Sequence, residues 1–155
     1  MINPDYSDLF ASLNTAEVRY LVVGAYAVAY HSVPRATKDL DVWVEPTRDN
    51  AERLTQALKR FGAPLANVSP ADFFTEGTVF QIGVAPNRID ILTAIGGVGF
   101  GEAWSGRLST SYGDQPIWVI GLEDLIRNKK AVGRHRDLAD VEELERLLDP
   151  SSPEG

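Results

Sequence analysis

The sequence predicts an α/β (α+β) domain in which a mixed β-sheet is flanked by helices. Helix-like and strand-like segments alternate through the first half of the chain. Four strand-like segments then follow one another, and two helical segments end the chain. This order, α-β-α-β-α-β-β-β-β-α-α, implies one sheet with both parallel and antiparallel neighbours.

The predicted helices begin and end at recognisable signals. Asn3 as N-cap and Pro4 at the first helical position predict a helix over 3–14. An amphipathic helix over 47–62 begins at Thr47 and ends at Gly62. The remaining predicted helices cover 25–31, which Pro34 ends, 121–132 and 137–148.

The predicted strands are short apolar runs. They cover 19–23, 39–45, 78–84, 88–94, 107–112 and 116–121. Between them we expect a short helical turn from Ser69, a tight turn at Pro86-Asn87, and an irregular glycine-rich loop with one turn of helix over 96–106.

Length and composition fit a single globular domain. The chain has 155 residues, of which 44% are hydrophobic and 24% charged. We expect residues 1–150 to form the domain and residues 151–155 to be a frayed tail. The chain has no cysteine, no basic secretory start, and no apolar run near the roughly 18 residues that a membrane span needs. These features favour a cytoplasmic protein that does not enter the membrane.

The charge distribution is uneven. The formal net charge is −7, which argues against general nucleic-acid binding through a wide basic face. Residues 127–136, RNKKAVGRHR, nevertheless gather basic side chains. This segment is either a solvated helix end or a local phosphate-binding patch.

Three aspartates lie where apolar strands predict them to be neighbours. Asp39 and Asp41 alternate along one strand and therefore share a face, together with Trp43. Asp90 lies on a later strand, on the face opposite to its apolar neighbours. Three adjacent carboxylates repel one another, and a hard divalent cation such as Mg2+ would relieve that repulsion. The alternative is structural: Asp39 caps the strand edge, and Asp41 pairs with Arg35 or Lys38.

A glycine turn precedes these aspartates. Gly24 ends one strand and opens a helix, whose free N–H groups are suited to binding phosphate. Arg35 follows, and its guanidinium fork is suited to a phosphate group. His31 is interpreted as a helix-end residue rather than a catalytic base.

The helical period separates the two neighbouring lysines of the basic segment. Lys129 falls on one stripe with Leu122, Leu125 and Ile126, whereas Lys130 is turned about 100° away. A lysine on an apolar stripe either extends its ammonium group to water or meets an anion. We predict that Lys129 meets an anion.

Together these motifs resemble the nucleotidyltransferase superfamily of the DNA polymerase β type, in particular its small bacterial branch. That branch includes the minimal nucleotidyltransferases and the abortive-infection, toxin-like proteins. The matching stretches are Gly24-Ala25, the segment 35–41 with the sequence RATKDLD, and the segment 129–144 with the sequence KKAVGRHRDLADVEEL. The resemblance spans residues 19–148.

The resemblance implies a nucleotidyltransferase-like fold and a metal-dependent enzyme that moves a nucleoside monophosphate from a nucleoside triphosphate to an acceptor hydroxyl. The acceptor would be an RNA end, a protein or a small molecule, and an antitoxin-like protein is an expected partner. Two Mg2+ ions are expected, with Mn2+ as a substitute. The implied residues are Asp39, Asp41 and Asp90 for catalysis and metal binding; Gly24, Ala25, Arg35, Thr37 and Lys129 for the nucleotide; and Lys38, Arg134, Asp137 and Asp140 for the rim of the site.

One position departs from the family pattern. Ala25 stands where the motif has a second glycine or a serine, so no hydroxyl is available there for a triphosphate oxygen. The alternative function is therefore a catalytically weak nucleotide-binding component of a toxin–antitoxin type pair. A metal phosphoesterase is disfavoured because the chain has only two histidines.

Overall fold

The computed structural model describes residues 2–33, 39–84 and 87–148. Six strands form one sheet in the order β3-β4-β2-β1-β6-β5. The strands are β1 (Tyr20–Val23), β2 (Asp39–Val44), β3 (Val79–Ile82), β4 (Arg88–Leu92), β5 (Leu108–Tyr112) and β6 (Gln115–Val119). The expected tail, 151–155, lies outside the described residues, as does Pro86 of the expected turn.

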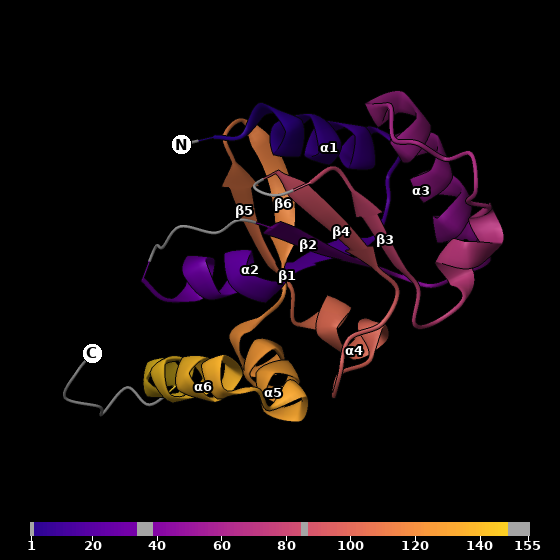
Figure 1. Ribbon diagram of the computed structural model, residues 1–155. Helices are drawn as coiled ribbons and strands as arrows, with labels where there is room; N and C mark the ends of the chain where they lie inside the picture. The colour runs from indigo at the N-terminus through magenta and orange to yellow at the C-terminus, as the bar shows by residue number, and fades with distance from the viewer. Residues whose placement is uncertain (1, 34–38, 85–86, 149–155) are drawn as a thin grey trace.

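Helices cover both faces of the sheet. Helices α1 (Pro4–Thr15) and α3 (Arg48–Phe61) lie on one side. On the other side lie α2 (Gly24–His31), α4 (Phe100–Ser105), α5 (Leu122–Val132) and α6 (His135–Leu148) (Figure 1). A 3-10 helix, η1 (Pro70–Phe74), packs beside α3. In the described ranges, no helix is long and apolar enough to cross a membrane.

The sheet is mixed, as the element order predicts. Strand β1 pairs antiparallel with β2 and parallel with β6, while β2 pairs parallel with β4. The outer pairs, β3–β4 and β5–β6, are antiparallel. The predicted fold class is therefore confirmed: helices flank one mixed sheet.

Strand alternation divides the side chains between the two faces. On the side of α1 and α3, Tyr20 stacks on Phe10 with ring centroids 6.0 Å apart. Ile89 and Ile91 pair with Leu40 and Val42 on this same face, and all four are buried. The predicted inward direction of the two isoleucines is thus confirmed, and the alternate residues of β2 and β4 face the other helical layer.

Element ends differ slightly from the sequence predictions. The last helix begins at His135 rather than at residue 137, because the Asp137 carboxylate accepts a hydrogen bond from the backbone N–H of Arg134 and so caps an earlier first turn. The predicted strands over 78–84 and 88–94 are shorter, at Val79–Ile82 and Arg88–Leu92. The expected helical turn in the glycine-rich loop is α4.

Candidate functional site

The three predicted aspartates lie side by side on two central strands. In the parallel β2–β4 pair, Asp41 is directly opposite Asp90, and Asp39 is opposite Arg88. All four residues occupy alternate positions and therefore share the face of the sheet that turns toward α2 and α5. The structure thus brings the three carboxylates together. Their catalytic and metal-binding roles stay a prediction.

Arg88 forms ion pairs with two of these carboxylates. Its Nη2 lies 3.0 Å from Asp39 Oδ2, and its Nε lies 3.2 Å from Asp90 Oδ1. The sequence motifs predict no role for Arg88. Its position two residues before Asp90 on the same strand was the available signal, because residues i and i+2 share a face.

Asp41 lies beneath the glycine turn. Gly24 has a left-handed backbone with φ +66°, and a Cβ at this position would collide with the Asp41 carboxylate. Glycine is required here both for the backbone conformation and for this close approach. Burial, together with the negative charges of Asp90 and Asp39, raises the pKa of Asp41 to about 6, although Arg88 and Lys129 oppose the shift.

The first turn of α2 opens toward this carboxylate. The N-cap residue is Val23, whose side chain cannot accept a hydrogen bond from the helix N–H groups. Ala25 is half-buried in this first turn. The helix start therefore offers backbone donors to an anion, while the carboxylate beside it would repel that anion unless a cation lay between them.

Lys129 meets anions from the chain itself. Its Nζ lies 3.0 Å from Asp137 Oδ1 and 3.4 Å from Asp140 Oδ2, and all three residues are buried. Arg134 Nε also donates to Asp137, at 2.6 Å. Burial works against ionisation of Asp137, but the hydrogen bonds from Arg134 and Lys129 lower its pKa to about 2.

The predicted difference between the two lysines is confirmed. Lys130 is exposed and pairs with Glu145 at 2.9 Å on the outer surface of the α5–α6 hairpin. Helix α6 packs against α5, and this packing brings Asp140 to Lys129.

A cavity of about 190 Å³ lies between the glycine turn at Gly24 and the α5–α6 hairpin. Its walls include Gly24, Asp41, Asn128, Lys129 and Arg134. Asn128 Nδ2 donates to the carbonyl of Gly96 at 2.9 Å and holds the glycine-rich loop against α5. The walls of this cavity thus carry carboxylate, amide and cationic groups.

A close approach between the glycine-rich loop and α5 fixes that wall. A Cβ on Gly97 would lie 2.7 Å from the Cβ of Ala131 and 3.2 Å from the carbonyl oxygen of Arg127. Gly97 also has a left-handed backbone, with φ +80°. Gly97 therefore permits the packing of this loop on α5, the helix whose Lys129 lines the cavity together with Asp41.

The carboxylate donors fit a hard divalent cation. In the described ranges, no three acidic or histidine side chains already stand in a metal-ligand arrangement. Even so, Asp39 Oδ1 and Asp90 Oδ1 are buried, and no described residue makes a hydrogen bond of acceptable geometry to either oxygen. Buried carboxylate oxygens without a hydrogen bond of good geometry, beside a third carboxylate of raised pKa, are hard oxygen donors of the type that Mg2+ prefers.

Several other candidates have structural explanations. His31 Nε2 donates to the carbonyl of Ile120 at 2.8 Å, so this residue docks the end of α2 on the segment after β6, in line with its interpretation as a helix-end residue. Trp43 is 1% exposed and packs edge-on against Phe100, so it offers no surface to a nucleobase. The predicted nucleotide or rim residues Arg35, Thr37 and Lys38 lie outside the described residues.

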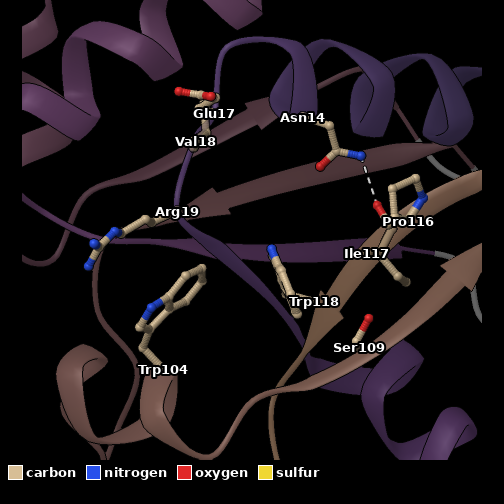
Figure 2. A pocket seen from close by; sticks show the side chains of 9 residues that line it. All are labelled: Asn14, Glu17, Val18, Arg19, Trp104, Ser109, Pro116, Ile117 and Trp118. Carbon is tan, nitrogen blue, oxygen red and sulfur yellow. Dashed lines mark hydrogen bonds between the residues drawn. The ribbon is translucent and has the colours of Figure 1, made fainter.

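A second cavity lies away from the carboxylates. Its volume is about 450 Å³. Figure 2 shows the residues that line it, among them Trp104, Trp118 and Arg19. The ring centroids of Trp104 and Trp118 are 5.9 Å apart. The guanidinium carbon of Arg107 lies 3.9 Å from the centroid of the Trp104 ring. This cavity is at the start of β1, whereas Gly24 follows the end of β1, so it is not part of the carboxylate site.

The fold matches solved nucleotidyltransferase structures. A lincosamide antibiotic adenylyltransferase, LnuA, with lincomycin bound, is 13% identical with a TM-score of 0.59, and the match covers 93% of this chain and 97% of that one. A proposed nucleotidyltransferase from Thermotoga maritima is 17% identical with a TM-score of 0.57 over 96% and 95% of the two chains. An antigenic nucleotidyltransferase-like protein from Paracoccidioides brasiliensis is 18% identical with a TM-score of 0.57 over 97% of this chain and 78% of that one.

These likenesses are structural. No protein-family model matches the sequence, and no curated protein matches it either. The chain has a nucleotidyltransferase-like fold, as the sequence motifs indicated.

Proposed function

We propose that this protein is a metal-dependent nucleotidyltransferase that transfers a nucleoside monophosphate from a nucleoside triphosphate to an acceptor hydroxyl and releases pyrophosphate. The observation that carries the proposal is the register of β2 and β4, which sets Asp41 opposite Asp90 beside the glycine turn at Gly24. The nucleotidyltransferase-like fold supports the same class of reaction.

The proposed triphosphate site lies between α2 and the α5–α6 hairpin. Backbone N–H groups at the start of α2 would bind phosphate oxygens, since Val23 provides no side-chain cap. Arg134 is exposed at the far wall of the cavity, and its guanidinium, which also pairs with Asp137, is a cation that a phosphate could recruit. Lys129, which is fixed by Asp137 and Asp140, would contribute a positive field rather than a flexible contact.

The carboxylates would hold the cation and the acceptor. Asp39, Asp41 and Asp90 are the proposed ligands of Mg2+, which when bound would neutralise the phosphates and the charge that develops during transfer. The acceptor oxygen would bond to the α-phosphorus as the bond from that phosphorus to the β-bridging oxygen breaks. The Asp90 carboxylate, whose Oδ1 is ion-paired with Arg88 without a hydrogen bond of good geometry, would accept the proton of the hydroxyl.

The proposed acceptor is a small molecule that carries a hydroxyl group. The adenylyltransferase LnuA, which is named for a lincosamide antibiotic, shares the fold at almost equal length. The cavity of about 190 Å³ beside Asp41 favours a compact hydroxyl-bearing small molecule over a long nucleic acid. The net charge of −7 also disfavours an RNA acceptor, because RNA would be repelled.

The test is transfer of label from each α-phosphorus-labelled triphosphate, with Mg2+, to separate pools of small molecules, RNA and protein. We expect label in the small-molecule pool together with pyrophosphate, and we expect Asp41→Asn or a chelator to abolish the transfer. Asp8→Asn, at an exposed aspartate on α1, is the matched control and should leave transfer unchanged.

Two other results of this experiment would count against the proposed transferase activity. Binding of Mg2+ and triphosphate without transfer to any pool would favour the catalytically weak nucleotide-binding protein that Ala25 suggests. Absence of triphosphate binding in the folded parent protein would overturn the proposal.

A further inference from the structure

We propose that Arg88 is the internal counter-ion of the carboxylate site. Its guanidinium group prevents free divalent cations from binding there and is displaced when a cation binds together with a triphosphate. This inference rests on the proposed function, because it concerns how the same three aspartates acquire their metal. It assigns Arg88 a positioning role that controls when the site is loaded.

The guanidinium group stands where a shared cation would stand. It spans the two strands, at 3.0 Å from Asp39 Oδ2 and 3.2 Å from Asp90 Oδ1, with a further contact of 3.4 Å to Asp90 Oδ2. A cation that used Asp39 and Asp90 together would need the same carboxylates. Arginine and metal therefore compete for one pair of ligands.

The geometry shows that the guanidinium satisfies these carboxylates incompletely. Arg88 Nε and the Oδ1 atoms of Asp39 and Asp90 are all buried, and within the described residues none of them makes a hydrogen bond of acceptable geometry. Coordination by a divalent cation would use oxygens that the guanidinium leaves without such bonds. Arg88 is thus a weaker partner that a stronger cation can displace.

Arg88 can leave without unfolding the strand. Its side chain is 36% exposed, whereas that of Asp90 is 12% exposed, so part of the arginine side chain reaches solvent although its Nε is buried. The backbone stays fixed because β4 pairs with β2 and β3, and because Tyr6 donates a hydrogen bond to the carbonyl of Arg88. Only the side chain has to rotate.

Displacement has a cost that a triphosphate can offset. A bare cation must break both ion pairs and leave the guanidinium without a partner. A triphosphate that enters from the glycine turn brings new oxygens, which a guanidinium can bind through two parallel hydrogen bonds. Metal and triphosphate should therefore bind cooperatively, and each should raise the affinity of the other by the same factor.

The test measures Mn2+ binding by calorimetry and by the electron-spin resonance of free Mn2+, with and without a non-hydrolysable triphosphate analogue. In the parent protein we expect weak binding of Mn2+ alone and much tighter binding with the analogue. Arg88→Ala should bind Mn2+ alone at least tenfold more tightly, a gain of about 1.4 kcal/mol. The cooperativity between the two ligands should fall by a similar factor.

Two further variants separate this effect from charge and folding. Arg53→Ala removes an exposed arginine from α3 and changes the net charge by the same one unit as Arg88→Ala, so its Mn2+ affinity should match the parent. Arg88→Lys keeps the charge but loses the planar fork that reaches both strands, so its affinity for Mn2+ alone should be intermediate. Circular dichroism establishes that each variant is folded.

The results distinguish two failures. If folded Arg88→Ala and Arg88→Lys bind Mn2+ alone no more tightly than the parent, while the parent binds Mn2+ with the analogue, the role of Arg88 is wrong and the proposed function stands. If no variant binds Mn2+ even with the analogue, both proposals fall.

Discussion

Asp41 on β2 lies directly opposite Asp90 on β4, so two carboxylates face each other across adjacent strands in the centre of the sheet. Such a pair destabilises the folded chain unless a cation binds. Arg88 supplies one positive charge through Asp39 and Asp90, and Asp41 is left with a raised pKa. Conflict of this kind between stability and charge is typical of a functional site.

The first prediction concerns the stability cost of Asp41. Its folded pKa of about 6 exceeds the ordinary value of 3.8, so the cost is absent below about pH 4 and grows as the pH rises through 6. Without metal, Asp41→Asn should raise the free energy of unfolding at pH 7 by on the order of 1–3 kcal/mol and change it little at pH 4. Urea unfolding at the two pH values measures this, and equal stabilities at pH 7 would contradict it.

The same substitution should remove ligand binding. Asp41→Asn weakens the anionic donor set, so we expect it to abolish Mg2+-dependent binding of a triphosphate while the domain stays folded. Titration calorimetry with Mg2+ and ATP is the measurement. Binding as tight as in the parent protein would show that Asp41 does not hold the metal.

The second prediction compares the two adjacent lysines. Lys129→Ala leaves Asp137 and Asp140 without their buried ammonium partner and should cost about 3–5 kcal/mol of stability. Lys130→Ala breaks only an exposed pair with Glu145 and should change stability by about 0.5 kcal/mol or less. Thermal unfolding measures both.

Activity should follow the same division. At a temperature where both variants are folded, we expect Lys129→Ala to lower catalytic rate or triphosphate affinity at least tenfold and Lys130→Ala to change little. Assays at low and high salt test whether a nucleic-acid acceptor binds the segment 127–136, since that case would make both substitutions harmful and steeply salt-dependent. Equal effects from the two lysines would refute the assignment by helical phase.

The third prediction concerns acid stability. The pKa of Asp137 is lowered to about 2, so its contribution is present above the ordinary value near 4 and is lost as the pH falls toward 2. Asp137→Asn should therefore cost at least about 2 kcal/mol at pH 7, and the difference from the parent should shrink between pH 4 and pH 2. Unfolding curves across this range show whether the gap closes.

The fourth prediction concerns the departure at Ala25. A serine there would add a hydroxyl in the first turn of α2, beside the proposed phosphate position. We expect Ala25→Ser to strengthen triphosphate binding or turnover modestly, since one hydrogen bond to a charged group is worth about 1.5–3 kcal/mol at most. Ala29→Ser, in the last turn of the same helix, is the control and should have no such effect. A neutral or harmful result at residue 25 would mean that the chain holds its phosphates differently.

The fifth prediction concerns a strained residue outside the site. Glu17 has a left-handed backbone with φ 57° just after α1, where its N–H bonds to the carbonyl of Asn14. Glycine adopts this conformation without steric cost, so Glu17→Gly should stabilise the protein by about 1 kcal/mol. Glu52→Gly, in the interior of α3, should instead destabilise it by roughly 0.5–1 kcal/mol. Opposite signs from the two substitutions would establish the strain, and a loss of stability in both would exclude it.

The sequence by itself determined the local features. Alternation along β2 and β4 placed Asp39, Asp41 and Asp90 on common faces, because side chains in a strand point to opposite sides in turn. Helical phase likewise separated Lys129 from Lys130, and a strand followed by a glycine and a helix marked the turn at Gly24. Each of these depends on residues a few positions apart, so spacing alone was sufficient.

The tertiary structure decided which of these groups meet. Only the parallel pairing of β2 with β4 sets Arg88 opposite Asp39 and makes it the counter-ion of two aspartates. Only the packing of α6 on α5 gives Lys129 its partners Asp137 and Asp140 in place of a free anion. The physical reason is that burial and Coulomb energies depend on distances between segments far apart in the chain, and residue spacing within one element carries no information about those distances.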